Sequence, residues 1–400
     1  MSENPIMVTP PNSETGCEAA SPERKTKMEK AAKRICVLSP FHWSAGLGGA
    51  EYQIKLLIDH LVQEGGWDVH YLTRYVSDDW QSDEYCVHKL TANSDGYNSR
   101  YLLDTPTLMD SLDRLAPDVI YARVGCAYVG VAARYCARTE CRLVWHVAAQ
   151  DDVQPRSGTF LETIKQVVNL QFFDKQVLEY GLRRADHIVV QTPEQAHALQ
   201  EHYNRSSTLI RNFHPLPAEV EQPKVDEKPV VVWIGNLKRI KQPGEYVKLA
   251  RQFAEMPVRF LMIGANQLVG AESDTLMQQI EGLDNLEYLG PKSQDEVNEL
   301  LTQAALLVNT SVSEGFSNTF IQAWMRGVPV LSLNSDPDNL LSSGRCGAYA
   351  DGSTEQLAKS LRSLLEEPST RAKISETAKD YALSNHGPGN MRLLEALFQG

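Results

Sequence analysis

Short apolar segments alternate with amphipathic segments along this chain, and the alternation occurs twice, on either side of a proline-rich stretch. Apolar runs separated by helical patterns are typical of parallel strands, because helices cover both faces of a parallel sheet. The expected strands are 35–39, 67–73, 86–90, 118–123, 142–148 and 186–192 before that stretch, and 229–235, 258–264, 286–290, 305–311, 329–334 and 347–350 after it. The expected fold class is therefore α/β, with two Rossmann-like domains facing each other across a cleft.

The proline-rich stretch gives the domain boundaries. Residues 212–229 contain four prolines and no hydrophobic period, as a linker does. We expect a disordered N-terminal tail at 1–33, an N-terminal domain at 34–212, a linker at 213–228, a C-terminal domain at 229–385 and a C-terminal tail at 386–400. Two origins are open for the last seven residues, LEALFQG: a cleaved protease site or the end of a native helix.

The composition is that of a globular protein, and it limits where the protein can be located and which partners it can bind. Apolar residues make up 42% of the chain, which allows a sizeable core. The formal net charge of −12 argues against nucleic-acid binding, which favours basic surfaces. No apolar run could span a bilayer and residues 1–33 lack a signal-peptide core, so we expect a cytoplasmic protein. Residues 23–34 carry six basic and two acidic side chains; they either touch the inner face of a membrane or form a solvated leader helix.

The segment SVSEGFSNTFIQAWMRGVPVL, residues 311–331, indicates a binding site. An expected strand ends at Ser311, and a helical pattern begins at Ser317. The first turn of a helix presents free N–H groups and the positive end of the dipole, which suit a phosphate. Glu314 lies between them, where open parallel sheets bind ligands, and a carboxylate accepts hydrogen bonds from hydroxyl groups. A ligand with both groups is a nucleotide sugar; the alternative is a capped helix beside a solvated glutamate.

This segment resembles the EGFxxxxxEAxxxGxPV motif of retaining glycosyltransferase family 4, which has the GT-B fold. Three further segments resemble the family's other motifs, in the same order: GLGGAE (46–51) its GG-x-E loop, VVVWIGNLKRIKQP (230–243) its G-R-L-x-x-x-K-G loop, and SSGRCGAYADGSTEQLAKSLRSLL (342–365) its continuation. The resemblance covers residues 34–383. Two positions depart from it: Gln322 replaces the second glutamate of the motif, and Asn236 replaces the usual arginine.

The resemblance implies a retaining, hexosyl-type glycosyltransferase that moves a sugar from a nucleotide diphosphate sugar to a hydroxyl group. The donor is expected to be a UDP-sugar in preference to a GDP-sugar, and the acceptor a glycan or a lipid-linked sugar. Surface polysaccharide or glycoconjugate synthesis and peripheral membrane contact are the expected setting. The N-terminal domain is then the acceptor domain and the C-terminal domain the nucleotide-sugar domain. No metal or other cofactor is expected, since the acidic pairs lack metal-ligand spacing.

The same resemblance assigns roles to individual residues. It implies that Glu314 and His146 are catalytic: Glu314 holds sugar hydroxyls, and His146 faces the sugar from the other domain. Lys241 is expected to contact the diphosphate. The expected donor-binding residues are Gly48, Gly49, Gly235, Asn236, Arg239, Lys241, Phe316, Ser317, Asn318, Thr319 and Gln322. An amide at Gln322 accepts a hydrogen bond only through its oxygen, so we expect it to hold the ribose less firmly than a carboxylate.

Each motif also has a structural interpretation. The glycines before Glu51 can form a simple turn, the Lys/Arg run can be a solvated loop, and His146 can be a satisfied buried residue. Two other functions stay open. One is a sugar-nucleotide epimerase of the same fold, and the other is a non-catalytic pseudo-enzyme, which the departures at Asn236 and Gln322 favour.

Overall fold

The computed structural model describes residues 33–45, 48–90, 101–155, 171–217, 228–314 and 316–400, and these form two compact units. The N-terminal unit comprises the chain up to Val190 with Ala196–Thr208 and Glu395–Gly400. The C-terminal unit comprises Gln191–Gln195 and Leu209–Leu394. Nearly all of the expected N-terminal tail and most of the expected linker lie outside the described residues, as do Gly46, Leu47 and Gly315.

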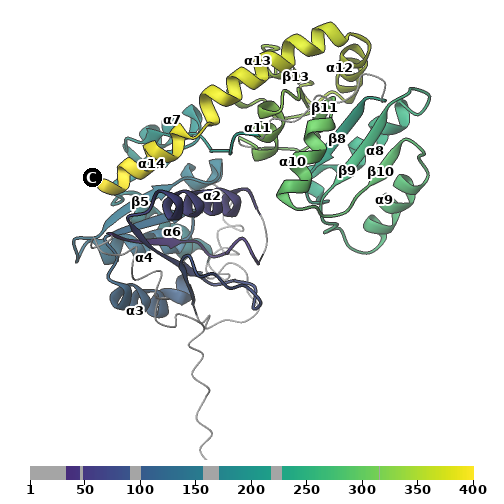
Figure 1. Ribbon diagram of the computed structural model, residues 1–400. Helices are drawn as coiled ribbons and strands as arrows, with labels where there is room; N and C mark the ends of the chain where they lie inside the picture. The colour runs from purple at the N-terminus through teal and green to yellow at the C-terminus, as the bar shows by residue number, and fades with distance from the viewer. Residues whose placement is uncertain (1–32, 46–47, 91–100, 156–170, 218–227, 315) are drawn as a thin grey trace, which may run out of the picture. The chain divides into compact units, whose positions relative to one another are not determined.

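The N-terminal unit, coloured purple to teal in Figure 1, is built on a sheet. This sheet has seven strands in the order β3-β2-β1-β4-β5-β6-β7. Its strands are β1 (Lys33–Leu38), β2 (Trp67–Thr73), β3 (Cys86–Lys89), β4 (Val119–Arg123), β5 (Arg142–His146), β6 (His187–Val190) and β7 (Thr208–Leu209). Its helices are α2 (Gly49–Glu64), α3 (Thr105–Leu115), α4 (Ala127–Cys136), α6 (Gln171–Leu182) and α7 (Pro193–Tyr203), with 3₁₀ turns η1 (Tyr101–Asp104) and η2 (Gln150–Val153). Because β1 pairs in parallel with both β2 and β4, the strand order reverses between β1 and β4.

The C-terminal unit is built on a six-stranded parallel sheet with the order β10-β9-β8-β11-β12-β13. Its strands are β8 (Val230–Ile234), β9 (Arg259–Ile263), β10 (Leu286–Tyr288), β11 (Leu306–Asn309), β12 (Val330–Ser332) and β13 (Gly347–Tyr349). Its helices are α8 (Pro243–Gln252), α9 (Ala271–Glu281), α10 (Gln294–Gln303), α11 (Asn318–Met325), α12 (Thr354–Glu366) and α13 (Pro368–His386), with 3₁₀ turns η3 (Arg239–Lys241) and η4 (Pro337–Asn339). Here the strand order reverses between β8 and β11.

Alternate side chains of these strands enter separate cores on the two faces of the C-terminal sheet. Val231 and Trp233 pack in one core with buried side chains of α8, α9 and α12. Val232 packs in the other core with buried side chains of α10, α11 and α13. Successive strand residues point to opposite faces, so a strand that is covered on both sides is apolar throughout.

The two parallel sheets confirm the expected α/β fold class with two Rossmann-like domains. The expected strands recur with ends that differ by at most two residues. Strand β7 was missed, because two exposed residues carry no hydrophobic period.

The end of the chain differs from the expected tail. Helix α14 (Gly389–Gln399) continues to the penultimate residue, and the Phe398 side chain is fully buried. The Phe398 ring lies 5.9 Å from the Trp67 ring and 5.7 Å from the Tyr121 ring. The Trp67 indole also donates to Glu395 over 2.9 Å. Residues of the LEALFQG segment are therefore packed against the N-terminal unit's own sheet.

Two buried histidines hold the start of α11 in the C-terminal unit. His214 contacts the Asn318 side-chain oxygen through Nε2 at 3.2 Å, and its backbone N–H donates to the His386 carbonyl over 3.0 Å. His386 Nδ1 lies 2.8 Å from the Asn212 carbonyl, and its ring packs 4.8 Å from the Phe316 ring. Burial lowers the pKa of His214 to about 4 and that of His386 to about 3. Both rings are therefore neutral at pH 7.

The C-terminal unit should lose stability as the pH falls below 6.5. A histidine with a lowered folded-state pKa binds its proton more readily in the unfolded chain, so its stabilisation is complete above the unfolded pKa and declines below it. For His214 the loss in the free energy of unfolding between pH 6.5 and pH 5 is expected to be about 1.5 kcal/mol. Most carboxylates titrate below this pH range. Urea denaturation of the full chain at several pH values measures this slope. His214→Asn should reduce the slope, and an unchanged slope would contradict the assignment.

Candidate functional site

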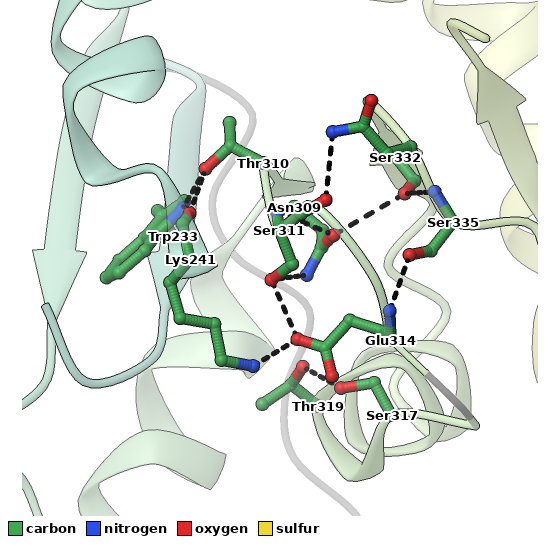
Figure 2. Close-up of polar contacts among 11 residues, drawn as sticks. Trp233, Lys241, Asn309, Thr310, Ser311, Glu314, Ser317, Thr319, Ser332 and Ser335 are labelled. Atoms are coloured by element: carbon green, nitrogen blue, oxygen red, sulfur yellow. Dashed lines mark hydrogen bonds and ion pairs between the residues drawn. The ribbon is translucent and has the colours of Figure 1, made fainter. Parts of the chain in front are cut away.

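Lys241 and Glu314 form an ion pair at the point where the strand order of the C-terminal unit reverses (Figure 2). Lys241 follows β8 and Glu314 follows β11, and these strands are parallel neighbours. Open parallel sheets bind ligands at the carboxyl ends of such strands. The Lys241 side chain is 28% exposed and the Glu314 side chain 15% exposed, so the pair is accessible from outside. Two residues 73 positions apart, both expected in the donor site, are thus in contact.

Hydroxyl groups of neighbouring residues fix the Glu314 loop. The Ser311 hydroxyl donates to Glu314 Oε1 over 2.7 Å, and the Glu314 backbone N–H donates to the Ser335 hydroxyl over 2.9 Å (Figure 2). Asn334 donates to the Ser311 carbonyl over 2.9 Å. Within the described chain, no hydrogen bond reaches Glu314 Oε2, which leaves that oxygen available to a ligand hydroxyl.

A second set of contacts fixes the loop that carries Lys241. The Thr310 hydroxyl donates to the carbonyls of Lys241 and Gln242 over 2.7 and 3.0 Å, and it accepts from the Trp233 indole over 2.9 Å (Figure 2). The Val312 N–H also donates to the Ile240 carbonyl over 2.8 Å. The loops after β8 and β11 are therefore joined backbone to backbone beside the ion pair.

The start of α11 presents backbone donors next to this pair. Ser317 is the N-cap residue, but its hydroxyl contacts the Thr319 hydroxyl at 2.9 Å and does not accept from the first-turn N–H groups. These N–H groups and the positive end of the helix dipole favour an anion. Ser317, Asn318 and Thr319 are all partly exposed. The site thus combines a cation, hydrogen-bond donors for an anion and a carboxylate for hydroxyl groups.

Several expected donor-binding side chains are engaged elsewhere. Arg239 is 85% exposed and donates to Glu272 of α9 over 2.8 Å, so it does not take the place of the missing arginine in this structure. The Asn236 side chain accepts from the Ala265 N–H over 3.2 Å and thereby ties two loops together. Phe316 is buried, with its ring against those of Trp324 and His386. Gly235 lies beside Lys241, since a Cβ on Gly235 would be 3.8 Å from Lys241 Cδ.

Gln322 is 3% exposed, and its amide nitrogen is hydrogen-bonded to side chains of α10. Gln322 Nε2 donates to Gln294 Oε1 over 2.8 Å and to Asn298 Oδ1 over 3.2 Å. Both hydrogens of the amide are therefore committed, and its oxygen is the atom left to accept a hydrogen bond.

The glycine turn of the N-terminal unit is covered by Glu51. Gly48 is the N-cap of α2 and Gly49 its first residue, and α2 is the helix that follows β1 in the chain. The Glu51 carboxylate is held by its own N–H and that of Gly48, and it would collide with a Cβ on Gly48. Burial raises the pKa of Glu51, with the nearby Arg123 charge acting in the opposite direction. The Glu51 carboxylate thus accepts hydrogen bonds at the start of its own helix.

His146 lies at the end of β5 in a buried polar cluster. Its Nδ1 is 2.9 Å from the Tyr121 hydroxyl and 3.0 Å from Arg123 Nη1. Burial, and then the Arg123 charge, hold the pKa of His146 well below its usual value. The imidazole is therefore neutral at pH 7, and it can exchange hydrogen bonds but not act as a cation.

Sequence reasoning missed residues of both units. Ser311 and Ser335 hold the Glu314 loop, while Tyr121 and Arg123 surround His146. A signal existed for Arg123, because a charged residue that ends a continuous apolar strand has to be stabilised by a partner or a ligand. Ser311 and Ser335 carried no such signal, since serines are common in loops of any function.

The described residues offer neither a cluster of metal ligands nor a helix that could span a membrane. No group of three or more His, Cys, Asp or Glu side chains within the described ranges could hold a metal ion. Within the same ranges, no helix combines the length and the apolar character needed to cross a membrane.

Both halves of the chain match family models of glycosyltransferases. Residues 218–381 match the model described as Glycosyl transferases group 1, and residues 47–216 match Glycosyltransferase Family 4. Each half of the chain therefore matches a glycosyltransferase domain model, and the two domains together have the GT-B fold.

The curated proteins that this chain matches are distant relatives, and each alignment covers only part of both proteins. The chain is 24% identical over 159 residues to Glycosyltransferase 1 domain-containing protein 1 of Xenopus tropicalis, which covers 39% of this chain and 45% of that protein. It is 25% identical over 205 residues to the lipopolysaccharide core biosynthesis glycosyltransferase LpsE of Rhizobium meliloti, covering 48% and 58%. It is 27% identical over 187 residues to the D-inositol 3-phosphate glycosyltransferase of Mycolicibacterium smegmatis, covering 42% of each. The chain thus spans about half the length of the curated relatives it matches.

Several solved structures share the fold of nearly the whole chain. Sucrose-phosphate synthase of Thermosynechococcus elongatus superposes with a TM-score of 0.72 at 18% identity, over 92% of this chain and 98% of that one. Anabaena HepE in complex with UDP-glucose superposes with a TM-score of 0.69 at 19% identity, over 92% and 100%. WaaG, involved in lipopolysaccharide biosynthesis, gives 0.68 at 14% identity, over 92% and 100%. At these identities the structures show that the fold is shared.

Proposed function

We propose that this chain is a retaining, hexosyl-type glycosyltransferase of family 4. It transfers a sugar from a nucleotide diphosphate sugar to a hydroxyl group of a glycan or lipid-linked acceptor. The observation that carries the proposal is the contact between Lys241 and Glu314 at the strand reversal, close to the first turn of α11. The HepE complex with UDP-glucose supports a UDP-sugar in preference to a GDP-sugar.

In the proposed reaction each group has a part. The diphosphate lies against the start of α11 and Lys241, which stabilise the charge that develops on the leaving group. Glu314 Oε2 accepts hydrogen bonds from sugar hydroxyls. The bond between the anomeric carbon and the diphosphate oxygen breaks, and the acceptor oxygen bonds to that carbon on the same face. The acceptor proton passes to a diphosphate oxygen, so no residue of the chain has to act as a base.

Two similar proteins support the proposed setting of the reaction. LpsE is named for lipopolysaccharide core biosynthesis and WaaG for lipopolysaccharide biosynthesis, which supports an acceptor that belongs to a surface polysaccharide or glycoconjugate. We propose that the protein works in the cytoplasm, with peripheral contact to the inner face of a membrane where such acceptors are anchored. Vesicle sedimentation with and without anionic lipid tests the membrane contact.

A donor screen tests the proposed function. The protein is incubated with UDP- and GDP-sugars and a panel of sugar and lipid-linked acceptors, and products are detected by mass spectrometry. NMR coupling constants of the product then give the anomeric configuration. Retention supports the proposal, inversion contradicts it, and no binding of UDP or GDP in thermal shift favours a pseudo-enzyme.

A sugar-nucleotide epimerase is the second candidate, because the fold is shared with a putative UDP-N-acetylglucosamine 2-epimerase of Listeria monocytogenes. That structure superposes with a TM-score of 0.61 at 14% identity, over 92% of this chain and 96% of that one. An epimerase releases a changed sugar nucleotide without any acceptor. Product analysis in the absence of acceptor therefore separates the two functions.

We predict that Gln322→Glu keeps activity and tightens donor binding by about 1 kcal/mol, the value of one hydrogen bond. A carboxylate offers two acceptor oxygens to a ribose, while the Gln294 and Asn298 amides can turn their NH₂ groups toward the new charge. Calorimetry with UDP and 2′-deoxy-UDP measures the change, and the preference for the ribo form should rise in the variant. An unchanged ratio would mean that Gln322 does not face the ribose.

A further inference from the structure

Tyr121, Arg123 and His146 form a connected polar chain at the carboxyl ends of β4 and β5. Arg123 and His146 are the last residues of their strands and lie opposite each other in the parallel register. Arg123 Nη1 donates to the Tyr121 hydroxyl over 3.1 Å, and that hydroxyl is 2.9 Å from His146 Nδ1. All three side chains are at most 3% exposed. Such a cluster is costly unless every member has its hydrogen-bond partner, so the direction of each bond is constrained.

Arg123 determines which group donates in each hydrogen bond of this cluster, because a guanidinium group donates and never accepts. Its bond to Tyr121 therefore uses the phenol oxygen as an acceptor, and the phenol proton is left to donate to His146 Nδ1. Arg123 Nη1 also lies 3.0 Å from Nδ1, so a proton on Nδ1 would face the N–H groups of Arg123. Its contact with Nε2 is longer, 3.5 Å, at the limit of a hydrogen bond. Nδ1 consequently carries a lone pair, and the proton of the imidazole is on Nε2.

We propose that Arg123 and Tyr121 are positioning residues that hold His146 as a neutral imidazole with its proton on Nε2. The role of this proton in catalysis rests on the proposed function, whereas the tautomer is a property of the ligand-free protein. His146 is then a hydrogen-bond donor to a sugar or phosphate oxygen. It cannot take the proton of an acceptor hydroxyl through Nε2, which agrees with transfer of that proton to the diphosphate.

The charged groups around the ring keep this state over a wide pH range. Arg123 is the cation beside it, Tyr121 is neutral, and Glu51 acts on Arg123 from the start of α2. Protonating the ring would place a second cation against Arg123 in a buried site. The transfer rate should therefore show no titration of His146 between pH 6 and 8.

The test is the tautomer itself, read from ¹⁵N NMR shifts of the histidine rings in the full chain, with His146→Gln used for assignment. The wild type should show only the Nε2–H form of His146. Arg123→Met removes the group that fixes the phenol as a donor, so the Tyr121 oxygen can accept from Nδ1–H and a measurable share of that form should appear. Arg123→Lys keeps a cation that only donates and should retain the wild-type tautomer.

Activity provides the second readout. Tyr121→Phe removes one hydrogen bond to the ring and should lower kcat about fivefold with little change in KM. Tyr203→Phe is the matched control, because it removes another buried hydroxyl of the same unit, one that donates to the Gln154 carbonyl, and it should leave kcat unchanged.

The proposal is overturned by an Nδ1–H or doubly protonated His146 in the wild type at pH 7. It is also overturned if Arg123→Met folds and leaves the tautomer unchanged. If NMR shows the expected tautomers but the protein transfers no sugar, the proposed function is refuted. The assignment of Arg123 and Tyr121 as positioning residues would then still hold.

Discussion

Replacing Glu314 with alanine is expected to lower sugar transfer at least about tenfold, the effect of roughly 1.4 kcal/mol of lost transition-state stabilisation. The carboxylate lies at a strand end and is oriented by Ser311 and Ser335, with one oxygen available to a ligand. Loss of the partly exposed ion pair with Lys241 should cost under about 1 kcal/mol of stability. Steady-state rates and thermal denaturation of the same preparation measure both effects.

The affinity for free UDP separates a catalytic role of Glu314 from a structural one. Because Glu314 pairs with Lys241 in the ligand-free protein, removing the carboxylate frees the cation for the diphosphate. Glu314→Ala should therefore bind UDP at least as tightly as the wild type while transferring sugar more slowly. Glu287→Ala breaks another glutamate–cation pair in the same unit, the one with Arg259, and should change neither property. Near wild-type transfer, or parallel losses of transfer and UDP binding, would refute the role of Glu314.

The fold was predictable because its signal is local. Most strands of the two sheets are largely apolar runs, and helical patterns separate the runs, so burial on both faces can be inferred from order along the chain. Phe398 shows the limit of this reasoning. Its burial depends on Trp67 and Tyr121, which are hundreds of positions away, and nothing in LEALFQG indicates that contact.

The site was predictable where backbone position alone determines the chemistry. Lys241 and Glu314 follow adjacent parallel strands, so their side chains meet at one edge of the sheet. Arg239 lies only two residues from Lys241 in the same loop, yet Glu272 attracts it toward α9. Its direction follows from tertiary contacts that the local sequence does not contain, and the amide contacts of Gln322 with α10 are of the same kind.

Lys241→Ala is expected to weaken UDP binding by roughly 10- to 100-fold, the value of a charge-assisted hydrogen bond of about 1.5 to 3 kcal/mol. Binding of uridine, which has no phosphate, should change little. The reason is that Lys241 stands beside the start of α11, where the backbone donors and the helix dipole favour an anion. Calorimetry with both ligands measures the difference.

Two comparisons make this result specific to the diphosphate. Lys238→Ala removes an exposed lysine from the same loop and should leave both affinities unchanged, so a general effect of net charge is excluded. In the Glu314→Ala background, Lys241→Ala should cost more UDP affinity than in the wild type, because the lysine no longer has to leave a carboxylate to reach the ligand. Equal weakening of UDP and uridine would show that Lys241 acts by holding its loop, and the diphosphate would then have to lie elsewhere in the chain.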